Sequence, residues 1–162
     1  MKKIVYIETT IVSLLVARPS RDIVMAGHQA ETRQWWDEKR VQYRCVTSEE
    51  VFREASRGDA EMVRLRLEAL NELPVLDVDE RVLRIAEEIL RDRILPPNVS
   101  SDAIHATVAA MHGANILLTW NCRHLANPDL LPRLRKFMER HGFELPEVCT
   151  PVELLADSGY ES

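Results

Sequence analysis

The stretch Ile4-Val5-Tyr6-Ile7-Glu8-Thr9-Thr10, close to the N-terminus, decides the expected fold. Its first four residues form a short, β-rich apolar run, which is typical of a strand buried on both faces. A carboxylate, Glu8, follows directly and is itself followed by two hydroxyl residues. An unpaired carboxylate at the end of a buried strand is costly to desolvate, so Glu8 indicates a paired or metal-binding position.

Helical patterns separate this run from four similar runs further along the chain. Strands are expected at residues 43–46, 74–78, 116–120 and 147–149. Helices are expected at residues 11–16, 22–39, 48–57, 60–70, 80–90, 102–112, 128–141 and 151–156. Thr47, with Glu50 three residues later, is the expected N-cap of the third helix. Neighbouring parallel strands need helical crossovers, so the alternation predicts an α/β fold with a mostly parallel sheet of about five strands.

Length and composition limit the class of protein further. The 162 residues suit one domain, expected over residues 1–156, with a frayed tail at residues 157–162. Three cysteines cannot all pair, which argues against a disulfide-stapled protein and fits a reducing compartment. No apolar run is long enough for a signal peptide or a membrane span, so we expect a soluble cytoplasmic protein with no membrane contact.

The acidic residues matter more for their placement than for their number. The formal net charge of -5 argues against binding nucleic acid by bulk charge alone. Glu8 follows the first strand, Asn121 follows the fourth, Asp102 begins the helix before it, and Glu54 lies on the helix after the second strand. Sites in open parallel sheets form beyond the carboxyl ends of the strands. These four oxygen-bearing side chains could therefore converge on a hard cation such as Mg²⁺ or Mn²⁺, which would also invert the local charge.

Each of these residues also has a structural explanation. Asp102 could be a first-turn acid favoured by the helix dipole. Glu54 lies one turn after Glu50, and the two could form a solvated helix face. Asn121 could be a turn residue. Glu8 is the hardest to explain without a ligand, because it ends a buried strand.

Four segments together resemble the PIN domain family, particularly the ribonuclease toxins of VapBC-type toxin–antitoxin systems. They are VYIETT at residues 5–10, SEEVFREASRGD at 48–59, SDAIHA at 101–106 and LLTWNCRHL at 117–125. The resemblance extends over nearly the whole chain. It implies a three-layer α/β/α fold and endonucleolytic, metal-dependent hydrolysis of RNA that leaves a 5′-phosphate and a 3′-hydroxyl.

The resemblance also assigns roles to residues. The metal-binding and catalytic positions are those of Glu8, Glu54, Asp102 and Asn121, and the supporting hydroxyls are those of Thr10 and Thr119. Glu54 matches rather than Glu50 because of its four-residue step to Gly58. Two positions depart from the family, which usually has Asp where this chain has Glu8 and often has Asp where it has Asn121. These departures leave a second hypothesis open: a degenerate PIN-like module that binds RNA or a protein without cleaving.

Partner and substrate contacts are expected around the same region. Arg53, Arg57 and Arg123 flank the site in sequence and could meet RNA phosphates, although for each one taken alone a solvated arginine is the favoured interpretation. Trp120 could stack a base, but core packing is the favoured interpretation. His105 could orient a ligand, but a hydrogen-bonded helix histidine is favoured. The resembling toxins bind an antitoxin and pair through their early helices, so an antitoxin partner and a homodimer are expected.

Overall fold

Five parallel strands form the sheet at the centre of the molecule, in the order β3-β2-β1-β4-β5. The strands are β1 (Ile4–Ile7), β2 (Arg44–Ser48), β3 (Val75–Leu76), β4 (Ile116–Leu118) and β5 (Glu147–Cys149). The computed structural model describes residues 1–156, so the tail expected at residues 157–162 lies outside the described residues. The prediction of an α/β fold with a mostly parallel sheet of about five strands is confirmed.

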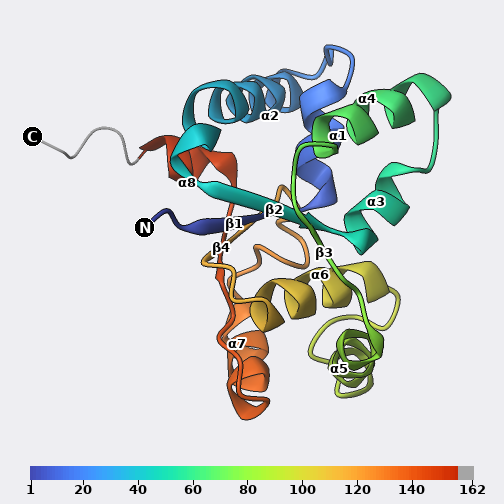
Figure 1. Cartoon of the computed structure of the whole chain (residues 1–162), viewed down its shortest axis with the longest axis vertical. Helices are drawn as coiled ribbons and strands as arrows, with labels where there is room; N and C mark the ends of the chain where they lie inside the picture. Colours follow the sequence, from blue (N-terminus) through green and yellow to red (C-terminus); the bar gives the residue numbers. More distant parts are fainter. Residues whose placement is uncertain (157–162) are drawn as a thin grey trace, which may run out of the picture.

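Helices cover both faces of this sheet, which gives the three-layer α/β/α arrangement (Figure 1). The α-helices are α1 (Thr9–Val16), α2 (Ile23–Gln34), α3 (Glu49–Ala55), α4 (Ala60–Leu70), α5 (Glu80–Arg91), α6 (Ser100–Met111), α7 (Leu131–Arg140) and α8 (Pro151–Ala156). A π-helical turn, η1 (Trp35–Lys39), and a 3₁₀ turn, η2 (Arg40–Gln42), continue α2. Figure 1 shows α1, α2 and α4 on one side of the sheet and α5, α6 and α7 on the other.

The two central strands, β1 and β4, carry the most buried part of the core. Val5, Tyr6 and Ile7 of β1 and Leu117 and Leu118 of β4 are all completely buried. Covering by helices on both faces explains why these strands are continuous apolar runs rather than alternating ones. It also makes their carboxyl ends a rigid platform for side chains that follow them.

Several boundaries differ from those expected from the sequence, among them those of α3, β3 and α7. Ser48, not Thr47, caps α3: its hydroxyl accepts from the backbone N–H of Val51, whereas the Thr47 hydroxyl donates to the carbonyl of Ile7. β3 ends at Leu76 because its partner β2 ends at Ser48, where α3 begins. α7 begins at Leu131, three residues later than expected.

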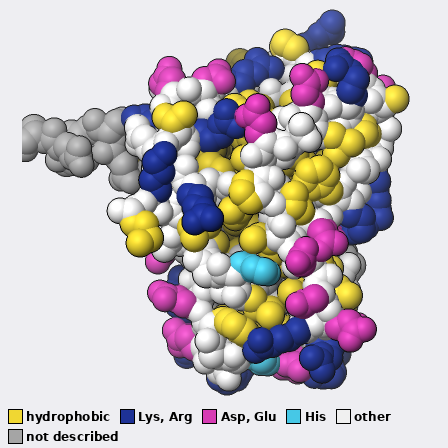
Figure 2. Space-filling view, viewed as in Figure 1, with side chains coloured by type: hydrophobic (Ala, Val, Ile, Leu, Met, Phe, Trp, Pro, Cys, Tyr) yellow, Lys and Arg dark blue, Asp and Glu magenta, His cyan; other side chains and the backbone are white. Residues whose placement is uncertain are grey.

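The surface carries charges of both signs. Figure 2 shows lysine and arginine side chains intermixed with acidic ones around the rim of one face, and hydrophobic side chains gathered towards its middle. None of the helices within residues 1–156 combines the length and the apolar character that a membrane span requires.

Candidate metal centre

The candidate site lies where the strand order reverses. The chain proceeds from β1 through β2 to β3 on one side and places β4 and β5 on the other, so the reversal falls between β1 and β4. Glu8 directly follows β1, and its backbone N–H donates to the carbonyl of Leu118 at the end of β4, at 3.1 Å. Thr119 and Asn121 follow β4 at the same edge. This is the edge that the sequence predicted, and it is where ligands bind in open parallel sheets.

Glu8 is held by two threonines. Its Oε2 accepts from the backbone N–H of Thr10 at 3.1 Å, from the Thr10 hydroxyl at 2.5 Å and from the Thr119 hydroxyl at 2.7 Å. Its Oε1 accepts no hydrogen bond from the described residues, while only 3% of the residue is exposed. Burial raises the pKa of Glu8 above its ordinary value even though these hydrogen bonds and the nearby His105 act against the shift. The expected supporting residues Thr10 and Thr119 do meet at Glu8.

Glu54, near the end of α3, resembles Glu8 in that one of its carboxylate oxygens is hydrogen-bonded and the other is not. Its Oε1 accepts from the Thr9 hydroxyl at 2.7 Å and lies 2.5 Å from Nε2 of His105. No hydrogen bond from residues 1–156 reaches its Oε2. Burial acts to raise the pKa of Glu54, but the hydrogen bond and charge of His105 outweigh it, so the pKa is lowered overall. Glu54 is therefore a carboxylate at neutral pH.

Asp102, in the first turn of α6, is joined to Asn121. The Asn121 side-chain amide donates from Nδ2 to Oδ1 of Asp102 at 3.0 Å, and its side-chain oxygen Oδ1 accepts from the backbone N–H of His124 at 3.1 Å. Asp102 Oδ2 receives no hydrogen bond from the part of the chain described. Burial raises the pKa of Asp102, against the opposing effects of His105 and Asn121. Asn121 thus holds Asp102, and a metal-ligand role for Asn121 stays a prediction.

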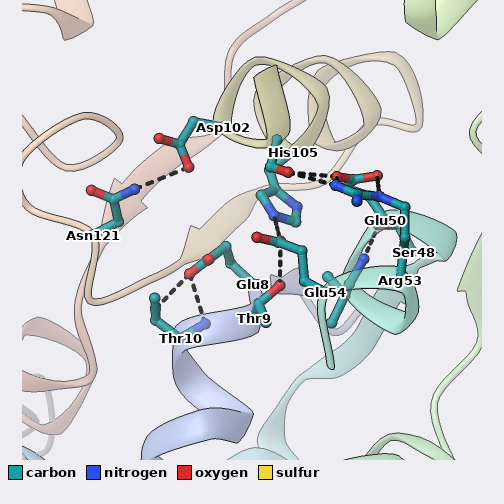
Figure 3. Close-up of polar contacts among 12 residues, drawn as sticks. Glu8, Thr9, Thr10, Ser48, Glu50, Arg53, Glu54, Asp102, His105 and Asn121 are labelled. Atoms are coloured by element: carbon teal, nitrogen blue, oxygen red, sulfur yellow. Dashed lines mark hydrogen bonds and ion pairs between the residues drawn. The ribbon is translucent and has the colours of Figure 1, made fainter. Parts of the chain in front are cut away.

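His105 lies at the centre of the site. One ligand atom from each of Glu8, Glu54 and His105 lies within 4.8 Å of the other two, and Figure 3 shows Asp102 and Asn121 to one side of this cluster. Burial alone would lower the pKa of His105, but the hydrogen bond with Glu54 and the charges of the nearby carboxylates raise it overall. The favoured sequence interpretation, a hydrogen-bonded helix histidine, describes its bonding but missed its position in the acidic cluster.

Glu50 and Arg53 form a separate pair beside the site. Arg53 makes an ion pair with Glu50 and donates to the Ser101 hydroxyl at 2.8 Å, and that hydroxyl donates to Glu50 at 2.6 Å. Burial would raise the pKa of Glu50, but the bonds from Arg53 and Ser101 lower it overall. The charge of Glu50 is thus already balanced by protein groups, which favours Glu54 as the acid available to a cation. Arg53 is likewise engaged.

The other candidate substrate residues differ from Arg53. The side chains of Arg57 and Arg123 are exposed and form neither a hydrogen bond nor an ion pair with the residues described. Trp120 is half-buried: its indole N–H donates to the Thr32 hydroxyl at 2.8 Å, and its ring stacks on His28 with 4.1 Å between centroids. This bonding accords with the favoured structural interpretation of Trp120.

The residues present fit a hard divalent cation. Each of the carboxylates Glu8, Glu54 and Asp102 has one oxygen held by protein donors and a second oxygen without a hydrogen bond from residues 1–156. In that same part of the chain, the fully buried side-chain polar atoms that lack a partner are Trp35 Nε1 and His124 Nδ1. The second oxygens of the three carboxylates are therefore not fully buried, and carboxylate oxygens are ligands that a hard divalent cation prefers.

Two comparisons with known proteins bear on this arrangement. The family model for the PIN domain matches residues 22–129, a stretch that includes Glu54, Asp102 and Asn121 and begins after Glu8. A similar solved structure is that of VapBC2 from Rickettsia felis bound to a DNA fragment from their promoter. It matches with a TM-score of 0.51 at 14% sequence identity, over 91% of this chain and 98% of that chain. This likeness shows a shared fold. A search among curated proteins finds no match.

Proposed function

The chain belongs to the PIN domain family, whose members are generally nucleases, and from this premise we propose that it is a metal-dependent endoribonuclease acting as the toxin of a toxin–antitoxin pair. The observation that carries the proposal is the arrangement of Glu8, Glu54 and Asp102, each with one oxygen fixed by protein donors and one left for a ligand. PIN nucleases use divalent metal ions, and an all-oxygen set of this kind suits Mg²⁺ or Mn²⁺.

The residues of the site divide into ligands and the groups that hold them. The chemistry that a bound Mg²⁺ or Mn²⁺ supplies is activation of water and neutralisation of phosphate charge. Thr10 and Thr119 fix Glu8, and Asn121 fixes Asp102. Held in this way, the carboxylates need little reorganisation when the ion and the phosphodiester arrive, which lowers the free-energy barrier of the reaction.

RNA is the proposed substrate. The net charge of -5 gives no bulk attraction for it, so binding depends on the cation and on local arginines. Arg57 and Arg123 are exposed and without an ion-pair partner among the described residues, and these two are the proposed phosphate contacts. Arg53 is the weaker candidate because Glu50 and Ser101 already engage it.

The decisive experiment is a cleavage assay with purified protein and a structured or tRNA-like RNA. We expect cleavage with Mn²⁺ or Mg²⁺, none with EDTA, and products with 5′-phosphate and 3′-hydroxyl ends. Asp102→Asn should reduce the rate by roughly a hundredfold or more, since it removes one ligand charge. His112→Gln, an exposed substitution at the other end of α6, is the control and should keep full activity. Cleavage that survives EDTA or Asp102→Asn would rule the mechanism out.

A second candidate function is a PIN-like module that binds RNA or a protein without cleaving. The observation that favours it is the neutral Asn121, which donates to Asp102 rather than adding a fourth carboxylate. Calorimetry with Mn²⁺ and binding assays with RNA separate the two functions. Tight RNA binding with no cleavage in any divalent metal would favour the module.

The antitoxin partner and the homodimer are part of the same proposal. Three consecutive apolar residues at the start of α2 are exposed: Ile23, Val24 and Met25. An exposed apolar run of this kind suits a protein partner, and the proposed one is a small antitoxin encoded by the neighbouring reading frame. Co-purification of that product tests the pairing, and analytical ultracentrifugation tests the dimer. The cytoplasm, where RNA is found, is the compartment we expect.

A further inference from the structure

A buried chain of hydrogen bonds runs from the sheet to Glu54. The Tyr6 hydroxyl lies 2.7 Å from the Ser48 hydroxyl and 2.7 Å from Nδ1 of His105, and Nε2 of His105 lies 2.5 Å from Oε1 of Glu54. Ser48, Tyr6 and His105 are each completely buried. This hydrogen-bond chain joins β2, β1, α6 and α3, so it ties together the elements that meet at the site. Figure 3 shows its end, where His105 faces Glu54.

The direction of the bond to Glu54 follows from the groups involved. An ionised carboxylate can only accept hydrogen bonds, so Nε2 of His105 carries the hydrogen and donates it to Glu54. Nδ1 on the opposite side of the ring is taken by the Tyr6 hydroxyl. Both ring nitrogens are therefore bonded to protein atoms, and neither is left to bind a metal ion. Oε1 of Glu54 is taken as well, because Thr9 donates to it at 2.7 Å.

We propose that His105 is a positioning residue: it holds Oε1 of Glu54, so that Glu54 meets the divalent cation through Oε2 alone, and it is not itself a metal ligand. This inference rests on the proposed function, because it concerns the same cation. A group that hydrogen-bonds to a metal-binding side chain fixes the orientation of that side chain. Loss of such a group typically lowers metal affinity by about 10–100-fold.

The alternative is that His105 binds the ion directly, since one of its nitrogens lies within 4.8 Å of ligand atoms of Glu8 and Glu54. Direct binding would require Nε2 to leave Glu54 and to lose its hydrogen. An imidazole ligand would also shift the preference of the site from Mg²⁺ towards transition metals. The two hypotheses therefore differ in an observable way, namely whether a histidine nitrogen is bound to the ion.

Pulsed electron paramagnetic resonance of Mn²⁺ in the wild-type protein tests this without any substitution. Protein labelled with ¹⁵N-histidine and unlabelled protein should give the same electron spin echo modulation, because no imidazole nitrogen is bound to the ion. A ¹⁵N-dependent coupling of the strength of a directly bound nitrogen would overturn the proposal.

Calorimetric Mn²⁺ titrations of substituted proteins test the positioning role. His105→Leu removes the donor and should weaken Mn²⁺ binding by about 10–100-fold. His105→Gln can place an amide N–H where Nε2 was, and it should restore most of that loss, which a merely space-filling role would not predict. His112→Gln, at the exposed C-cap of α6, is the matched control. Equal affinities of His105→Leu and wild type, or no rescue by Gln, would overturn the proposal.

Tyr6→Phe provides a second variant should His105→Leu fail to fold. It keeps the ring and the volume, and it removes the hydroxyl that fixes Nδ1 of His105. We expect a smaller loss of Mn²⁺ affinity than the one caused by His105→Leu. An unchanged affinity would contradict a role for the Tyr6–His105 hydrogen bond in positioning Glu54. Wild-type protein that bound no Mn²⁺ would overturn both this inference and the proposed function. Mn²⁺ binding with the expected pattern but without RNA cleavage would overturn the nuclease function alone.

Discussion

The side-chain amide of Asn121 donates a hydrogen bond to the Asp102 carboxylate, with 3.0 Å between Nδ2 and Oδ1. An aspartate at position 121 would place two like charges at this distance. The amide instead gives Asp102 a donor, which favours the charged form of Asp102 against the burial that raises its pKa. Asn121, being neutral, therefore stabilises the folded protein in the absence of an ion relative to an aspartate at the same position.

Asn121→Asp should lower the stability of the metal-free protein and increase its response to metal. The new carboxylate repels Asp102, so we expect the melting temperature at pH 7 to fall by a few degrees in EDTA. Mn²⁺ should then raise the melting temperature of this variant by more than it raises that of the wild type, since a bound cation would relieve the repulsion between Asp102 and the new carboxylate. Scanning calorimetry with and without Mn²⁺ measures both effects. Asn71→Asp adds the same charge at an exposed position away from the site and should not increase the response to Mn²⁺.

Glu8→Gln should stabilise the metal-free protein at neutral pH. The pKa of Glu8 is raised on folding by burial, so its charged form is disfavoured in the folded state and opposes folding above that pKa. Removing the charge should raise the melting temperature at pH 7 by roughly 2–4 °C, which is about 1 kcal/mol for a domain of this size. The difference should vanish below the ordinary value of 4.5, where both states are protonated. The Mn²⁺-induced shift should disappear at every pH.

The arginines should separate into two classes. In an Asp102→Asn background, Arg57→Ala and Arg123→Ala should each weaken RNA binding and reduce the slope of log affinity against log salt by about 1. Arg53→Ala should leave the slope unchanged and instead lower the free energy of unfolding by about 1–3 kcal/mol, because it removes a partner of buried Glu50. Fluorescence anisotropy at several salt concentrations and urea unfolding measure the two quantities. A steeply reduced slope for Arg53→Ala would place that side chain on the RNA.

The contact between His141 and Glu88 should make stability depend on pH. The ring donates to the carbonyl of Phe137 and meets Glu88 at 2.6 Å, and these bonds raise the pKa of His141 above its ordinary value of 6.5. A raised folded pKa stabilises the fold fully below about 6.5 and loses that contribution as pH rises through the folded value. The stability difference between wild type and Glu88→Gln should thus be larger at about pH 6 than at about pH 8. Urea unfolding across this range measures it.

Much of the fold could be predicted because its determinants are local. The apolar runs that become β1 and β4, and the helices between strands, are visible as periods of hydrophobicity along the chain. Glu8 and Asn121 follow two of those runs, so their place at the reversal of strand order follows from the order of elements. The end of β3 could not be predicted in this way, because it depends on where its partner β2 stops at Ser48.

The bonding inside the site was less predictable because it depends on residues far apart in sequence. His105 is joined to Tyr6 and Glu54, which lie 99 and 51 positions away. A histidine three residues after Asp102 gives no sign of such partners. Arg53 was a plausible phosphate contact from its position alone, but Glu50, three residues earlier on the same helix, engages it. That spacing is typical of an intrahelical ion pair and could have indicated the outcome.

Of the five strands, the one that comes first in the sequence is the middle strand of the sheet. Thr119, which helps to fix the Glu8 carboxylate, is added to the growing chain 111 positions after Glu8. At about 5–20 residues per second, this interval lasts on the order of 10 s. Throughout it, the nascent chain carries Glu8 without β4 beside it and without Asp102 or Asn121. The acidic site can therefore be assembled only after Asn121 has been translated, so the order of translation delays the formation of the site relative to its first residue.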